Sequence, residues 1–305
     1  MFKIATAHSA SFLVACEEGS IRSASERLGV EPSTITRHIQ SLETSLGAAL
    51  IERGHTGICP TEAGQILQTY LKRQQCDEEA LLSEFDALKG MRRGQLVIAV
   101  GDGFISDFIG NALRLYRGSY PGFTYDLLSG STEQVLHAVR TDQAHLGMAY
   151  NARKERSIKT AAQSKQPLEL LVSPHSDWAN LPEPMTMKAL EHLPAALLKS
   201  GSGVGDMIQA AEGAHGVRLN AVVQSNSLAV LRNFVRDGLG VTILPAFVVT
   251  REIADGTIVT KRLDIPELSR GEASLFTRAG RRLPEGASRL AHHIARAMVA
   301  FRAAG

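Results

Sequence analysis

The residues with the clearest chemical potential lie between Pro32 and Leu46. Four apolar residues at intervals of four, three and four predict a helix with one apolar face: Ile35, Ile39, Leu42 and Leu46. At about 100° per residue, the opposite face carries hydroxyl, amide and guanidinium groups, from Ser33, Arg37, Gln40 and Thr44, with Thr34 and Thr36 near the N-terminal end. Arg can pair with guanine, Gln with adenine, and hydroxyls can hold phosphates, so this face has the chemistry to read a major groove. A solvated polar face is the alternative for an isolated helix.

Two shorter helices precede this one and would position it. Residues 4 to 17 show broadly helical spacing, and Ser20 can cap a second helix from Ile21 to Leu28. The tight turn 29–31 and Pro32, which is favoured at the first helical position, then complete a helix-turn-helix. We expect Arg37 to contact base edges, and Ser20 and Thr34 to contact the DNA backbone.

Residues 50–60 follow this helix and predict a small β-hairpin, the wing of a winged helix. Two short apolar segments flank the turn at 54–57. Arg53 and His55 are placed there to contact backbone phosphate or the minor groove, although exposed loop charges commonly contact nothing specific.

The net charge of the chain is too small to attract DNA by itself. The whole chain carries a net charge of only +2, and its first sixty residues contain five Lys or Arg against six Glu. Binding must therefore depend on where the charges lie, because no bulk attraction to nucleic acid is available. Apolar residues at 44% and charged residues at 21% are typical of a globular protein and argue against disorder.

A long helix is predicted from Thr61, its capping residue, to about Lys89, and would span about 42 Å at 1.5 Å per residue. Its apolar seam is interrupted around Gln74 and Asp77 and consists of Ala63, Leu67, Tyr70, Leu81, Phe85 and Leu88. This pattern predicts an imperfect coiled-coil contact that makes a dimer, chiefly through Leu67, Leu81 and Phe85. Packing within one chain is the alternative.

From residue 95 onward, apolar strands and amphipathic helices alternate. Strands are predicted at 95–100, 123–128, 145–149, 168–172, 221–224 and 241–244, and helices at about 104–117, 132–140, 203–213 and 227–237. This alternation predicts an α/β fold with parallel sheets covered by helices, in two subdomains.

The chain resembles the LysR-type transcriptional regulators over essentially its whole length. The likeness is carried by Phe12-Leu13-Val14-Ala15, Gly19-Ser20, Ala24, Leu28, Thr36-Arg37, Ile39, Leu42-Glu43, Leu46-Gly47, Leu50, Arg53 and Thr61-Glu62-Ala63-Gly64, and further on by Tyr120-Pro121-Gly122, Pro167-Leu168, Asp237-Gly238-Leu239-Gly240-Val241 and Leu244-Pro245. Departures from the family pattern are Ser25, Thr36, Ile51, Asp142-Gln143 and His145.

The resemblance implies a domain plan. It consists of a winged helix-turn-helix DNA-binding domain at 1–60, a linker helix for dimerisation at 61–90, and a two-lobed, periplasmic-binding-protein-like α/β effector domain at 91–305. Lobe one covers about 94–155 and 266–305, and lobe two about 156–265. The implied protein is a homodimer or homotetramer on an interrupted inverted-repeat operator of double-stranded DNA, controlled by a small-molecule effector, with RNA polymerase as a further candidate partner.

The effector site is expected where the C-terminal ends of parallel strands face the following helices. The loops that would meet there contribute Asp102, Gly103, Phe104, Ser131, Thr132, Ser200, Ser202, Asn226 and Ser227. Their polar groups suit a carboxylate, whereas Asp102 favours an amine or a hydroxyl, so an amphoteric or polyhydroxy metabolite is preferred. The alternative is that Ser131, Thr132 and Ser227 only cap helices.

No constellation for catalysis, a metal or a cofactor is recognised, so we do not expect an enzyme. The glycine-rich segment 201–205 fits neither the dinucleotide-binding fingerprint nor the P-loop spacing. Residues 129–131 lack the nucleophile turn of a serine hydrolase. His292 and His293 are adjacent and therefore point in different directions on a helix, so they do not form a shared metal site.

The cysteines and the N-terminal segment bear on the compartment. Cys16, Cys59 and Cys76 are odd in number and lack metal-ligand spacing, which fits a reducing cytoplasm, and no segment is apolar enough to span a membrane. Residues 13–16 resemble a lipoprotein cleavage box, which leaves one rival hypothesis, a lipid-anchored periplasmic solute-binding protein. The polar residues before that segment favour an amphipathic helix instead.

Overall fold

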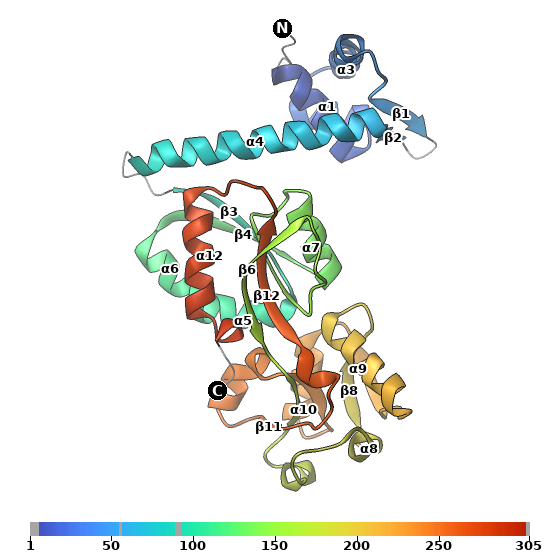
Figure 1. The fold of residues 1–305 in the computed structure, drawn as a ribbon, viewed down its shortest axis with the longest axis vertical. Coiled ribbons are helices and arrows are strands. Elements are labelled where there is room, and N and C mark those ends of the chain that lie inside the picture. The colour runs from blue at the N-terminus through green and yellow to red at the C-terminus, as the bar shows by residue number, and fades with distance from the viewer. Residues whose placement is uncertain (1–5, 55–56, 89–92, 303–305) are drawn as a thin grey trace. The chain divides into compact units, whose positions relative to one another are not determined.

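The computed structural model describes residues 6–54, 57–88 and 93–302, and the chain divides into two compact units, Met1–Glu79 and Ala80–Gly305 (Figure 1). The first unit contains α1 (Thr6–Glu18), α2 (Ile21–Leu28), α3 (Pro32–Leu46) and the antiparallel hairpin of β1 (Ile51–Gly54) and β2 (Gly57–Pro60). The long helix α4 (Glu62–Leu88) begins in this unit and ends in the second.

Local signals in the sequence explain where these helices begin and end. The Ser20 hydroxyl accepts a hydrogen bond from the Ser23 N–H at 3.3 Å and caps α2. Gly29 ends α2 with a left-handed backbone (φ 65°), which glycine adopts without steric cost, and Pro32 occupies the first turn of α3. The predicted helix-turn-helix is therefore present, with its first two proposed residues, 4 and 5, outside the described residues.

The core of the first unit is built from one face of each helix. Phe12, Ala24, Ile35 and Ile39 are almost fully buried, and Leu42 joins them. Leu46 does not, because it is 40% exposed, so the apolar face predicted for α3 ends one turn earlier.

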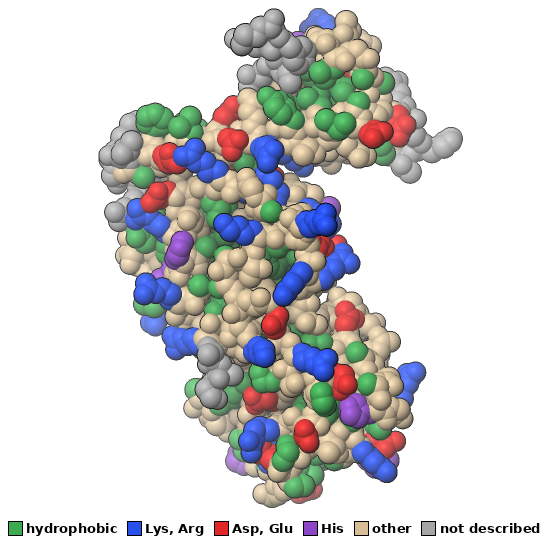
Figure 2. All heavy atoms as spheres, viewed as in Figure 1, with side chains coloured by type: hydrophobic (Ala, Val, Ile, Leu, Met, Phe, Trp, Pro, Cys, Tyr) green, Lys and Arg blue, Asp and Glu red, His purple; other side chains and the backbone are tan. Residues whose placement is uncertain are grey.

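Helix α4 is continuous, as predicted, but its seam differs from the prediction. Leu67 is buried in the core of the first unit and is not available to a partner. Leu81 and Phe85 are 47% and 53% exposed, and Leu82 is exposed beside them. Figure 2 shows apolar side chains, in green, at the surface over this end of α4.

The second unit begins with a five-stranded sheet in the order β4-β3-β5-β12-β6. Its strands are β3 (Arg93–Val100), β4 (Gly122–Ser129), β5 (Leu146–Tyr150), β6 (Ile158–Lys165) and β12 (Glu272–Arg278). Alternate residues of β3 face opposite cores: Ile98 packs into the main core with α12, whereas Ala99 packs into the core formed with α7. Helices thus cover both faces of the sheet (Figure 1).

The helices of this first lobe connect and cover its strands. They are η1 (Asp102–Phe104), α5 (Ile105–Asp107), the π-helix η2 (Phe108–Leu113), α6 (Arg114–Ser119), α7 (Thr132–Arg140), α12 (Glu285–Ala297) and η6 (Val299–Phe301). The buried Asp107 carboxylate accepts hydrogen bonds from the Val299 and Ala300 N–H groups, at 3.1 and 2.8 Å, and so fixes the C-terminal segment onto this lobe.

The second lobe has two small sheets. One has the order β10-β7-β11 and is antiparallel, with β7 (Leu168–Val172), β10 (Thr242–Pro245) and β11 (Val259–Lys261); the other pairs β8 (Ala195–Leu198) with β9 (Ala221–Ser225) in parallel. Its helices are η3 (Asp177–Asn180), α8 (Met187–Leu190), α9 (Gly203–His215), α10 (Leu228–Arg236), η4 (Ala246–Val249), α11 (Thr250–Ala254) and η5 (Leu268–Arg270).

The α/β fold class is confirmed, but two details of the prediction are wrong. The five-stranded sheet is mixed, because β12 pairs antiparallel with both β5 and β6, and the sheet of β7, β10 and β11 is antiparallel. Lobe two was also predicted to start at about residue 156, which would include the residues of β6. Strand β6 pairs with β12 in the sheet of lobe one, so lobe two starts after Lys165.

The chain passes between the lobes twice, after β6 and before β12, and the two passages are joined. The Gln166 N–H donates to the Gly271 carbonyl at 2.8 Å, and the Tyr150 hydroxyl donates to the Gln166 carbonyl at 2.5 Å. Burial of Tyr150 raises the pKa of its hydroxyl, so the group stays a donor. The rings of Phe104 and Phe247, one from each lobe, lie 4.9 Å apart and form an apolar contact at this hinge.

Candidate functional site

Helix α3 presents the polar face that the sequence predicts. Ser33, Arg37 and Gln40 are exposed, and Thr34 and Thr36 are partly exposed. In the described part of the chain, the side chains of Arg37 and Gln40 have no hydrogen-bond or ion-pair partner within the protein. The Thr36 hydroxyl instead donates to the Pro32 carbonyl at 3.1 Å. The two side chains best suited to base edges are thus both available.

The proposed backbone contacts lie around the first turn of α2 and the wing. Ser20 is the N-cap of α2, and N-terminal turns of helices favour phosphate. Arg22 in the same turn was not predicted, although its position just after a capping serine could have indicated it; its side chain is 86% exposed and pairs with Glu26. The Arg53 side chain and His55 lie outside the described residues, so their predicted contacts remain predictions.

A histidine fixes the inner side of α3 to α1. The Ser11 hydroxyl lies 2.8 Å from His38 Nδ1, and the rings of His8 and His38 are 4.5 Å apart. Desolvation lowers the pKa of His38, and the neighbouring His8 and Arg37 lower it further. A neutral imidazole here positions the helix without adding charge to its exposed face.

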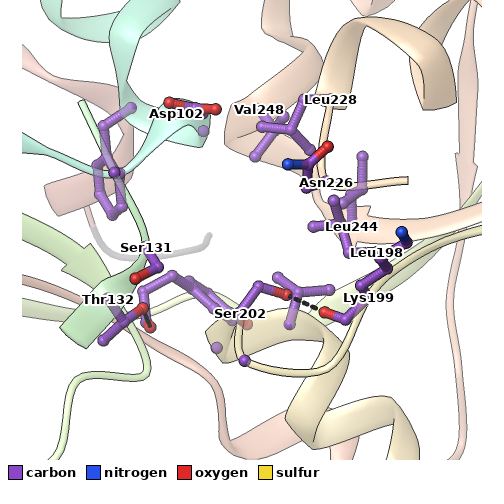
Figure 3. Close-up of a pocket in the computed structure, with 18 of the residues that line it drawn as sticks. Asp102, Ser131, Thr132, Leu198, Lys199, Ser202, Asn226, Leu228, Leu244 and Val248 are labelled. Carbon is purple, nitrogen blue, oxygen red and sulfur yellow. Dashed lines mark hydrogen bonds between the residues drawn. The ribbon is translucent and has the colours of Figure 1, made fainter. Parts of the chain in front are cut away.

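A cavity of about 420 Å³ lies between the two lobes of the second unit (Figure 3). The carboxyl ends of β3, β4 and β5 open into it from one lobe, and loops before α9 and α10 reach it from the other. Eight of the nine predicted effector residues line this cavity: Asp102, Gly103, Phe104, Ser131, Thr132, Ser200, Ser202 and Asn226. Ser227 does not line it.

Several of the cleft's hydroxyl groups already have partners in the protein. The Ser131 hydroxyl accepts from the Gln134 N–H at 3.3 Å in a capping box, and Thr132 donates to the Tyr150 carbonyl at 3.3 Å. The Ser202 hydroxyl accepts from Gly205 N–H and donates to the Lys199 carbonyl, both at 3.0 Å (Figure 3). The capping alternative is correct for Ser131, and Ser202 caps α9 in the same way. Ser227 makes no such cap.

Gly203 brings the first turn of α9 to the end of β5. A Cβ at this position would lie 2.2 Å from the Tyr150 carbonyl oxygen and 3.3 Å from Asn151 Cβ. Only glycine allows this approach, so the glycine-rich segment 201–205 opens a helix, as predicted, and holds it against the opposite lobe.

The apolar wall of the cleft was not predicted. It consists of side chains from lobe two: Leu198, Leu228, Leu244 and Val248. Lys199 and Gln134 also line the cavity and were missed. Position after a strand could have indicated Lys199, but the apolar residues carry no signal that separates them from ordinary core.

The first unit therefore offers a major-groove reader and the second a ligand cleft, which together define a ligand-controlled DNA-binding regulator. The chain belongs to the LysR family: residues 89–299 match the family described as LysR substrate binding domain, and residues 7–65 match the bacterial regulatory helix-turn-helix protein, lysR family. It is a LysR-type transcriptional regulator with a DNA-binding helix-turn-helix and an effector-binding domain.

Named relatives agree with this assignment. The chain is 24% identical to a probable nitrogen assimilation transcriptional activator of Synechococcus elongatus, over 83% of this chain and 82% of that one. It is 26% identical to the HTH-type transcriptional regulator PtxR of Pseudomonas aeruginosa, over 83% and 80%.

Solved structures share the fold. A full-length OxyR variant from Pseudomonas aeruginosa gives a TM-score of 0.71 at 18% identity, covering 98% of this chain and 97% of that one. ArgP from Mycobacterium tuberculosis gives 0.67 at 19% identity, covering 95% and 98%. CbnR in complex with its target DNA gives 0.57 at 20% identity, again covering 95% and 98%.

The rival hypothesis of a periplasmic binding protein gains no support from these relatives. Its lipoprotein-like segment lies within α1, where Leu13 and Ala15 are buried in the helix-turn-helix core, and inside the matched region 7–65. In the described ranges, none of the helices is both long and apolar enough to cross a membrane.

Proposed function

We propose that this regulator binds an interrupted inverted repeat through α3, with Arg37 and Gln40 contacting base edges and Ser20, Thr34 and Arg53 contacting the backbone. The supporting observation is the exposed, unpartnered pair Arg37 and Gln40 on a helix whose other face is buried. The protein would act in the cytoplasm by binding alone, without catalysis, and RNA polymerase is a further candidate partner.

Two copies would join through the exposed apolar end of α4. Leu81, Leu82 and Phe85 are apolar side chains at the surface of one helix, and burying them against a second copy would remove that area from water. Leu67 is left out of this contact, since it is used within the first unit.

The cleft between the lobes would hold a small polar effector. Its serine and threonine side chains and Lys199 suit an oxygen-rich ligand, whereas Asp102 would repel a plain carboxylate, so an amphoteric or polyhydroxy compound is favoured. Occupation would alter DNA binding by favouring one arrangement of the lobes.

A gel shift on the DNA that flanks the gene, repeated with pools of metabolites, tests the whole proposal. Arg37→Ala should lose roughly 1 to 3 kcal/mol of operator binding. Arg296→Ala, an exposed arginine of α12, is the matched control and should bind normally. If Arg37→Ala kept the affinity and sequence preference of the unaltered chain, the assignment of the recognition face would be refuted.

The cleft is tested by ligand-induced thermal shifts with whichever metabolite changes the gel shift. Thr132→Val and Ser202→Ala should both reduce the response, because they remove cleft hydroxyls that fix the first turns of α7 and α9. An undiminished response in both variants, with unchanged stability without ligand, would place the effector elsewhere.

A further inference from the structure

We propose that the effector is an α-amino acid with an aliphatic side chain. This inference rests on the effector cleft proposed above and names the class of ligand that the cleft fits. Its volume of about 420 Å³ lies near the lower end of the roughly 300–1,000 Å³ usual for ligand sites, so the ligand is small. The cleft's walls differ in chemistry, and each wall matches one part of such a molecule.

The first wall carries a carboxylate that a cationic group would satisfy. Asp102 is exposed at the mouth of lobe one and faces the cavity in Figure 3. Among the described residues, its carboxylate has no hydrogen-bond or ion-pair partner within the protein. It is also the one acidic residue among those that line the cavity. An ammonium group is the ligand group that this position favours.

A second wall offers hydrogen-bond donors to an anion. Figure 3 places Ser131, Thr132 and Ser202 together, across the cavity from Asp102. The Thr132 and Ser202 hydroxyls donate to the Tyr150 and Lys199 carbonyls, and the Ser131 and Gly201 N–H groups donate to side chains of their own helices. The donors that remain for an anion are the Ser131 hydroxyl and Lys199, which also lines the cavity. A carboxylate satisfies several such donors at once. The cavity therefore separates a site for a cation from a site for an anion.

The third wall is aliphatic. Leu228, Leu244 and Val248 line it, and Leu244 is fully buried. The wall lies next to the Asp102 loop, since a Cβ on Gly103 would be 3.2 Å from Val248 Cγ2 and 3.7 Å from Leu228 Cδ1. A hydrocarbon side chain gains free energy on this surface, whereas a hydroxyl placed there would lose its hydrogen bonds to water.

These three features together separate the candidate ligands. A plain carboxylate would be repelled by Asp102 and would leave that side chain unpaired. A polyhydroxy compound would place hydroxyl groups against the aliphatic wall, where they have no hydrogen-bond partners. A basic amino acid would need a second carboxylate in the lining, which the cavity does not provide. An aliphatic amino acid meets all three requirements with one charge of each sign.

Isothermal titration of the full chain with L-leucine, L-valine and L-methionine tests this inference. Two analogues of leucine each lack one charge: 3-methylbutylamine and 4-methylpentanoate. At least one of the three amino acids should bind, and both analogues should bind at least tenfold more weakly than leucine, a loss of about 1.4 kcal/mol or more. Absence of binding by all three amino acids at millimolar concentration, or equal binding of either analogue, would overturn the inference.

Variants then locate the ammonium. Asp102→Asn should weaken binding of the amino acid at least tenfold and improve binding of 4-methylpentanoate, because the repelling charge is gone. Asp255→Asn, an exposed aspartate of lobe two outside the cavity, should change neither. Unchanged amino-acid binding in Asp102→Asn would also overturn the inference.

Failure of this inference is distinguishable from failure of the cleft itself. If a metabolite of another class binds and Ser202→Ala weakens it, the cleft stands and the amino-acid assignment is wrong. If Ser202→Ala and Thr132→Val leave binding of every ligand unchanged, the cleft is not the effector site. Unfolding followed by the fluorescence of Trp178, which packs against the core of the second unit, shows in either case that the variants fold.

Discussion

Replacement of Gly203 by alanine tests the close contact at the start of α9. Alanine in place of glycine within a helix normally stabilises a protein by roughly 0.5–1 kcal/mol. At Gly203, however, the new Cβ would lie 2.2 Å from the Tyr150 carbonyl oxygen, more than 1 Å inside ordinary contact. Because the obstacle is main chain, the helix must move, and overpacking of this kind costs about 1–3 kcal/mol.

The same helix supplies a matched control. Gly213 has no heavy atom within 4 Å of its Cβ position, so Gly213→Ala should show only the ordinary stabilisation. The two variants should differ by roughly 1.5–4 kcal/mol in the free energy of unfolding. For a unit of this size, each kcal/mol corresponds to about 2–4 °C in Tm.

The assay can follow the single tryptophan of the chain. Trp178 is partly buried and packs against the core of the second unit, so its fluorescence reports unfolding of that unit in the full-length protein. Gly203→Ala should also respond less to the effector, since its displaced helix carries Ser202. If Gly203→Ala were as stabilising as Gly213→Ala, the contact with Tyr150 would be refuted.

Three further predictions concern the first unit and α4. Leu81→Glu should convert dimers to monomers in sedimentation, whereas Leu67→Ala should instead destabilise the first unit by about 2–5 kcal/mol; a stable Leu81→Glu dimer would move the main subunit contact to the effector domains. Burial raises the pKa of Cys16 to about 11, so at neutral pH iodoacetamide should modify the exposed Cys59 first, as mass spectrometry of timed samples will show; equal rates would contradict this. The pKa of His38 is lowered below the ordinary 6.5, so the folded unit binds fewer protons than the unfolded one, and its contribution to stability is present above pH 6.5 and falls below it. Circular-dichroism melts between about pH 7 and pH 5 should show this loss in the native chain and not in His38→Gln.

The sequence predicts those elements whose pattern is local. Helix α7 and strand β7 have the predicted bounds, 132–140 and 168–172, because an amphipathic helix and an apolar strand each show their periodicity within a few residues. Strand β6 was missed because it is an edge strand whose residues are mostly polar and exposed. The predicted parallel direction was wrong for β7 and β10, which pair antiparallel, since pairing between residues far apart in the chain leaves no local signal.

The candidate site divides in the same way. Loops after strands predicted eight lining residues, because the carboxyl ends of parallel strands share one edge of a sheet. Ser227 was misplaced because a position beside the cavity does not determine where a side chain points. Leu228 and Val248 were missed, since their role depends on which core residues happen to border the cleft. Leu67 shows the same limit on α4, where periodicity alone cannot say which neighbour covers an apolar residue.

The order of strands in the first lobe has a consequence for synthesis on the ribosome. Strand β12, near the C-terminus, lies between β5 and β6, so the sheet has a gap in its middle until residues 272–278 have been made. The second lobe is a continuous insertion that emerges earlier and can fold first, because domains generally fold as units during synthesis. Until then β5 and β6 present unpaired edges, which can pair with other chains. Nonsense mutations between β11, the last strand of lobe two, and β12, the last strand of lobe one, should therefore yield aggregates and not a truncated, working regulator.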